Sequence, residues 1–161
     1  MYSVLDVSRH VINYCNDKDY DLSNLKLQKL LYFIQAYYVS KTASKEPCFG
    51  DKIEAWVFGP VVPRAYHEYK KYGSTNIPPI TTYIQIDEND FWQSKVVKYN
   101  DETLAKSDKE LIDRLIDNFS KFSTTALVRI THNQLPWIEA YNRGKDKVIT
   151  VEAMRSYFNG R

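Results

Sequence analysis

The chain has 161 residues and a mass of 18.9 kDa, a length that suits one domain with a single core. Its 22 basic and 20 acidic residues give a net charge of +2, which argues against a strongly basic nucleic-acid binder or an acidic tail. Hydrophobic residues at 43% and charged residues at 26% argue against disorder. The 13 tyrosines suit a protein interface as well as an aromatic core.

Two cysteines, Cys15 and Cys48, lie far apart and form no Cys-x-x-Cys pair or ligand-spaced Cys/His cluster. We therefore expect no metal site and no cofactor. Free thiols fit a reducing compartment. No apolar run reaches the ~18 residues of a membrane span, and the N-terminus lacks the basic and apolar segments of a signal peptide. These features predict a cytoplasmic protein without membrane contact.

The first third of the chain predicts two helices. Ser3 is a candidate N-cap for a first helix, which we expect to end near Asn16-Asp17. Ser23 is a candidate N-cap for a second helix over residues 24–40. Because this segment is apolar on almost every side, we expect it to be the central helix of the fold.

The middle of the chain predicts short β elements and one short helix. After a loop over residues 41–51, residues 53–58 are expected to form a strand that Gly59-Pro60 ends. Pro63 favours the start of a helix over residues 63–72. Residues 82–86 and 95–99 have strand-like composition and predict a loose hairpin within 82–99.

The last third predicts four helices. Ser107 and Glu110 form a capping-box pattern ahead of the first, and Ser123 is a candidate cap for the second. Pro136 is expected near the start of the third, and Thr150 before the fourth, over residues 151–158. The expected fold is therefore mainly α: one compact helical domain over residues 1–161 with a small β element.

Recognisable catalytic patterns are absent from the sequence. There is no nucleophile elbow, phosphate-binding glycine loop or second histidine of a zinc-protease helix. We expect His132 to bond backbone groups at a junction between helices. An alternative is a hydrolase that uses His67 and His132 with a carboxylate from Glu54 or Glu68; it requires these side chains to converge in one pocket.

A second alternative is a regulator, associated with a phage or prophage, that binds nucleic acid. It would use a basic and aromatic surface, and the near-neutral net charge favours an ordinary solvated face instead. The residues of that surface would be Lys26, Lys29, Lys41, Lys45, Tyr37 and Tyr38, with Lys70 and Lys71.

Three separate blocks carry a family resemblance. Residues 26–37 (KLQKLLYFIQAY) resemble the opening helix motif of the Panacea antitoxin domain, a family that includes phage-associated GepA-type proteins and SocA-like proteolytic adapters. Residues 53–63 (IEAWVFGPVVP), with Tyr66 to Gly73 after them, resemble its central signature. Thr131-His132, Pro136-Trp137 and residues 149–158 resemble its C-terminal signature. None of the three blocks lies within residues 74–105.

The resemblance implies a mainly helical, non-enzymatic antitoxin that binds and neutralises a cognate toxin protein. Neutralisation would proceed by occlusion of the toxin or by its delivery to a ClpXP-type protease, and a homodimer is left open. The signature residues Trp56, Gly59, Pro60, Pro63, His132, Pro136 and Trp137 are expected to be structural. We expect the toxin to contact the edge of the rigid turn before the 63–72 helix, through Arg64, Tyr66, His67 and Lys70.

Overall fold

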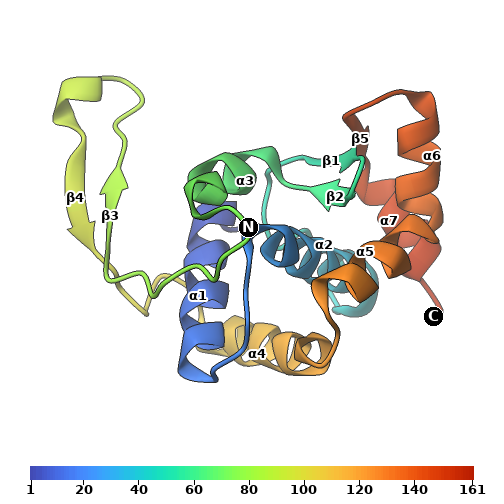
Figure 1. Cartoon of the computed structure of the whole chain (residues 1–161), viewed down its shortest axis with the longest axis horizontal. Helices are drawn as coiled ribbons and strands as arrows, with labels where there is room; N and C mark the ends of the chain where they lie inside the picture. The colour runs from blue at the N-terminus through green and yellow to red at the C-terminus, as the bar shows by residue number, and fades with distance from the viewer.

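The computed structural model describes all residues 1–161 and is mainly helical, as the sequence predicted. Seven α-helices surround one hydrophobic core, with a small antiparallel sheet on one side and a separate two-stranded hairpin on the other (Figure 1). One cluster of 31 buried residues makes up the core. None of the helices combines the length and apolar composition that crossing a bilayer requires.

Helix α2 (Asn24–Lys41) lies at the centre of the body, as expected (Figure 1). The Oγ atom of Ser23 caps it by accepting a hydrogen bond from the backbone N–H of Lys26. Leu27, Leu31 and Tyr32 are fully buried, and α1, α3, α4, α5 and α7 all contact the helix. Its sequence is apolar on nearly every side because it has neighbours on nearly every side.

Helices α1 (Val4–Asp17) and α4 (Lys106–Ser120) pack together across the chain. Ser3 caps α1 as predicted. The start predicted for α4 was wrong: Ser107 lies inside the helix, and the N-cap is Ala105, which makes no side-chain cap. The hydroxyl of Tyr2 replaces that cap. It accepts a hydrogen bond from the Ala105 N–H and donates one to the carboxylate of Asp108.

The small sheet has the order β2-β1-β5, and both of its strand pairs are antiparallel. The predicted single strand over 53–58 is two strands, β1 (Ile53–Trp56) and β2 (Gly59–Val61), with the chain reversal at Val57-Phe58. Pro60 is tolerated because β2 is an edge strand. The third strand, β5 (Lys147–Ile149), was not predicted.

The remaining helices follow the predicted boundaries closely. Helix α3 (Pro63–Tyr69) continues into the 3-10 turn η1 (Lys70–Tyr72) and stops at Gly73. Ser123 and Thr150 accept N-cap hydrogen bonds as predicted. The helices of the last third after α4 are α5 (Thr124–His132), α6 (Leu135–Arg143) and α7 (Val151–Phe158).

The predicted hairpin is present as β3 (Thr82–Gln85) and β4 (Lys95–Lys98), with the 3-10 turn η2 (Phe91–Gln93) near its tip. It projects from the body (Figure 1). Asn13 anchors its base by exchanging two hydrogen bonds with the backbone of Ile80. Its large apolar side chains remain exposed, namely Ile84, Ile86, Phe91, Trp92 and Val96.

Candidate partner-binding groove

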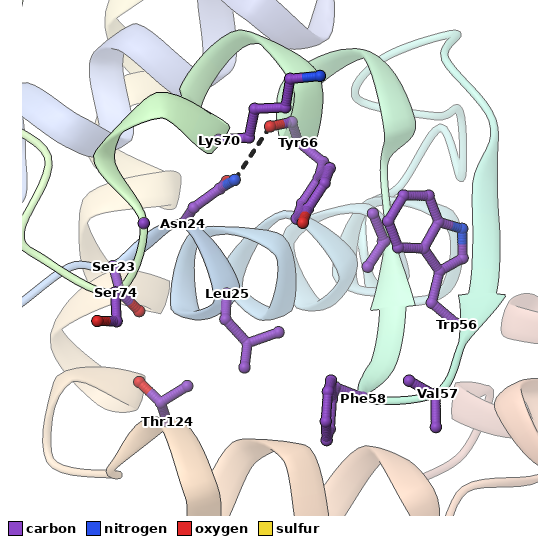
Figure 2. Close-up of a pocket in the computed structure, with 12 residues that line it drawn as sticks. Ser23, Asn24, Leu25, Trp56, Val57, Phe58, Tyr66, Lys70, Ser74 and Thr124 are labelled. Atoms are coloured by element: carbon purple, nitrogen blue, oxygen red, sulfur yellow. Dashed lines mark hydrogen bonds between the residues drawn. The ribbon is translucent and has the colours of Figure 1, made fainter.

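A depression of about 480 Å³ lies where the start of α2, the β1–β2 turn, the α3–η1 segment and the start of α5 meet (Figure 2). Half of its twelve lining residues are hydrophobic. These six are Leu25, Trp56, Val57, Phe58, Val61 and Tyr66. Phe58 is 61% exposed and Val57 is 52% exposed, so the β1–β2 turn offers apolar side chains to solvent. We call this depression the groove.

An aromatic cluster forms one wall of the groove. The ring of Tyr66 meets the indole of Trp56 edge-on, with 4.9 Å between ring centroids. His67 packs beside both, at 5.5 Å from Tyr66 and 6.3 Å from Trp56. The indole N–H of Trp56 donates to a carboxylate oxygen of Glu54 at 2.8 Å, which fixes the ring. The wall is therefore ordered before any partner arrives, which lowers the entropy cost of binding.

Buried amides hold α3 against α2 behind this wall. The side-chain amide of Asn24 donates to the backbone carbonyl of Tyr66 at 3.0 Å (Figure 2). Gln28 donates to the Asn24 side-chain oxygen and accepts from the N–H of Val62, at 2.9 and 3.0 Å. Because each buried amide is satisfied by its neighbour, the position of Tyr66 is set by the core helix.

The four residues expected to contact a partner do not all lie together. Tyr66 and Lys70 line the groove, and His67 packs against Tyr66 without lining the groove itself. Arg64 lies away from the groove, where its guanidinium approaches the carboxylate of Asp51 at 3.4 Å. Sequence reasoning missed a further set of lining residues, which come from other elements: Leu25, Phe58 and Thr124. The sequence did hold one signal for Phe58: the apolar pair Val57-Phe58 directly precedes Gly59-Pro60, where a chain reversal can expose apolar side chains.

The signature residues of the C-terminal blocks brace the β1–β2 turn. The indole N–H of Trp137 donates to the carbonyl of Trp56 at 2.8 Å, and Nε2 of His132 lies 2.9 Å from the carbonyl of Val57. The rings of His132 and Trp137 pack at 4.3 Å between centroids. Pro136 is buried in the first turn of α6, next to Trp137. These contacts make the turn a fixed part of the groove.

The turn also covers a fully buried lysine. The ammonium of Lys29 donates to the carbonyl of Pro60 at 2.9 Å, and burial lowers its pKa to about 7. Gly59 has a φ of +106° and touches this side chain: a Cβ atom there would lie 2.7 Å from Cε of Lys29 and 2.8 Å from Oγ1 of Thr131. Only glycine fits both the backbone angle and the space.

Each alternative function loses side chains that it needs, because they are buried or bonded elsewhere. The basic surface proposed for nucleic acid loses Lys26, Lys29 and Tyr38, because all three are buried. None of the four residues of the hydrolase alternative lines the groove. His132 is engaged with a backbone carbonyl, and the carboxylate of Glu54 is paired with Lys52 and with the indole of Trp56.

The comparisons with known proteins agree with the sequence resemblance. Residues 27–138 match the family model described as antitoxin SocA-like, Panacea domain. Antitoxin SocA of Caulobacter vibrioides (strain NA1000 / CB15N) is 31% identical over 135 residues, which cover 81% of this chain and 68% of that protein. No solved structure matches the chain. The chain therefore belongs to the SocA-like antitoxin family that the Panacea domain defines.

Proposed function

We propose that this chain is a cytoplasmic antitoxin whose residues 1–161 act as one unit and hold a cognate toxin protein in the groove. The observation that carries the proposal is the ordered aromatic wall of Trp56 and Tyr66, supported by His67, beside the exposed side chain of Phe58. Aromatic residues in a preformed depression are the usual anchors of protein interfaces. The chain acts by binding, and no catalytic step is needed.

Direct occlusion of the toxin is the mechanism that the groove favours, because a rigid, partly apolar surface suits a stable complex. Delivery to a ClpXP-type protease is the alternative. Co-expression of this chain with the open reading frame beside its gene separates the two. Under occlusion, growth is restored and the two proteins purify together. Under delivery, growth is restored while the toxin disappears, and it persists when the protease is deleted.

A double variant, Tyr66→Ala with His67→Ala, tests the groove. It should abolish toxin neutralisation and leave the helical circular dichroism intact. The matched control is Phe91→Ser with Trp92→Ser, which removes a comparable aromatic pair from the hairpin tip, where Trp92 is 89% exposed. If the Tyr66/His67 variant still neutralised the toxin and the Phe91/Trp92 variant did not, the toxin would bind at the hairpin rather than in the groove.

A further inference from the structure

A second depression adjoins the groove, between the start of α2, the start of α5 and the segment after η1. It has a volume of about 470 Å³, and none of its eight lining residues is hydrophobic. Ser23, Ser74 and Thr124 line both depressions, so the two share a wall. Figure 2 shows these three side chains together at one end of the groove. We call this second depression the polar pocket.

Lys26 lines the polar pocket and has no partner in the chain. Its side chain is largely buried, with 7% of the residue exposed, yet its ammonium makes no hydrogen bond and no ion pair. No fully buried side-chain nitrogen or oxygen lacks a hydrogen-bond partner. The ammonium of Lys26 therefore keeps some contact with solvent, and the residue lines the polar pocket. A lysine this buried is normally paired, so the pocket offers an unpaired cation to an anionic ligand.

Two helix N-termini open into the same pocket. Helix α2 begins after Ser23 and helix α5 after Ser123, and both serines line the pocket. Each serine Oγ accepts one backbone N–H, from Lys26 and from Ala126, which leaves its own hydroxyl hydrogen free to donate. The first backbone N–H groups of both helices have no acceptor within the chain. Such N–H groups favour negative charge.

The charge of the pocket selects the kind of anion. Asp21 also lines it, with its carboxylate accepting a hydrogen bond from the side-chain amide of Asn76 at 3.0 Å. One lysine and one aspartate line the pocket without forming an ion pair, so its formal charge is close to zero. This balance fits a single carboxylate better than a doubly charged phosphate, and it does not fit a nucleic-acid strand, which needs several cations along its backbone.

We propose that the polar pocket binds a carboxylate of the protein partner, on a segment whose neighbouring apolar side chain occupies the groove. Lys26 supplies the charge, and the hydroxyls of Ser23, Ser123 and Thr124 supply hydrogen-bond donors. The proposal rests on the proposed function, because it names the chemistry of the toxin segment: an aromatic or aliphatic residue close to an acidic one.

Acetate is the probe for the pocket alone. Sodium acetate is titrated into the full chain at constant ionic strength, and amide chemical shifts are followed by NMR. We expect saturable shifts at the amides of Leu25 and Thr125, in the first turns of α2 and α5. Lys26→Met, which keeps the apolar stem, should remove them, and Lys121→Met should not, because Lys121 is an exposed lysine near α5 that does not line the pocket.

Three results of the titration would overturn the proposal: shifts that never saturate, shifts that persist in Lys26→Met, or inorganic phosphate that binds more than tenfold tighter than acetate. Circular dichroism and thermal unfolding verify that Lys26→Met remains folded. If Lys26→Met does not fold, Lys26→Gln takes its place under the same criteria.

The toxin complex provides the second readout. Lys26→Met should weaken toxin binding by roughly 10- to 100-fold, the usual effect of losing a charge-assisted hydrogen bond, and Lys26→Arg should restore part of it. Equal binding by the wild type and Lys26→Met would overturn the carboxylate inference and leave the antitoxin function standing. If the wild type binds no toxin, the proposed function fails, and the acetate titration still decides whether the pocket takes a carboxylate.

Discussion

The indole N–H of Trp137 donates a hydrogen bond to the backbone carbonyl of Trp56, 2.8 Å away and 81 positions earlier in the chain. This bond joins helix α6 to the end of strand β1, where the groove begins. The aromatic wall of the groove therefore depends on a residue that does not line it. The stability of the turn and the shape of the binding surface should vary together.

Trp137→Phe should destabilise the protein by about 1–3 kcal/mol, because it keeps most of the ring but leaves the carbonyl of Trp56 without its donor. Urea unfolding followed by circular dichroism measures the change. Trp92→Phe is the matched control, since Trp92 is 89% exposed and the substitution should change stability by less than ~0.5 kcal/mol. Equal effects of the two substitutions would contradict this account of the turn.

Gly59→Ala should cost about 2 kcal/mol or more, because the new Cβ would meet Lys29 and Thr131 at a φ of +106°. Gly73→Ala separates backbone strain from crowding: Gly73 has a φ of +57°, but nothing lies within 4 Å of an added Cβ. Its ψ of −130° makes this a conformation that residues other than glycine rarely adopt, so backbone strain alone should cost about 1–3 kcal/mol. A smaller loss at position 59 than at position 73, measured by thermal unfolding, would show that the turn is not tightly packed on Lys29.

Stability should rise with pH above neutrality because of Lys29. Its pKa is about 7 in the folded protein and near 10.5 when unfolded, so the unfolded state binds more protons between these values. The free energy of unfolding should therefore increase by about 2 kcal/mol from pH 7 to pH 8.5. Burial raises the pKa of the Cys15 and Cys48 thiols to about 12, which reverses the trend above about pH 9.

Lys29→Met tests whether Lys29 causes this rise in the free energy of unfolding with pH. It removes the titrating group and keeps the apolar stem beside Gly59, so the rise between pH 7 and 8.5 should disappear. Thermal unfolding of both proteins across this range is the measurement. A slope that survives the substitution would have to come from another group.

The hairpin should be dispensable for folding of the body. Its strands expose Ile84 and Val96, and the hydrogen bonds that anchor its base join Asn13 to Ile80, outside both strands. Replacing residues 82–98 by a short glycine-serine linker should leave the helical circular dichroism of the rest intact and toxin co-purification unchanged. A folded body that no longer retains the toxin would place the contact on the hairpin.

Elements set by local chemistry could be predicted from the sequence. Ser23, Ser123 and Thr150 cap helices where the sequence placed them, because a side-chain oxygen at an N-cap acts on the next few residues. The start of α4 could not be predicted from its local sequence, because no side chain at its N-cap forms a capping bond. Its first turn is fixed by Tyr2, whose hydroxyl bonds both Ala105 and Asp108 from the other end of the chain.

The candidate site could be predicted only in part from the sequence, because some of its residues come from distant parts of the chain. Tyr66, His67 and Lys70 lie in one short helical segment with a clear proline start, so the sequence brought them together. Leu25 and Thr124 reach the groove from helices far away in the chain, and no local pattern joins them. The sequence places Lys26 on a possible basic surface, but the fold buries it, which is rare for a lysine.

Hydrogen–deuterium exchange of the chain with and without its toxin tests the central claim most directly. The groove account predicts slower exchange at the backbone amides of Val57 and Phe58, over residues 66–70, and in the first turn of α2. Slower exchange confined to the hairpin, residues 82–98, with the groove amides unchanged, would contradict it.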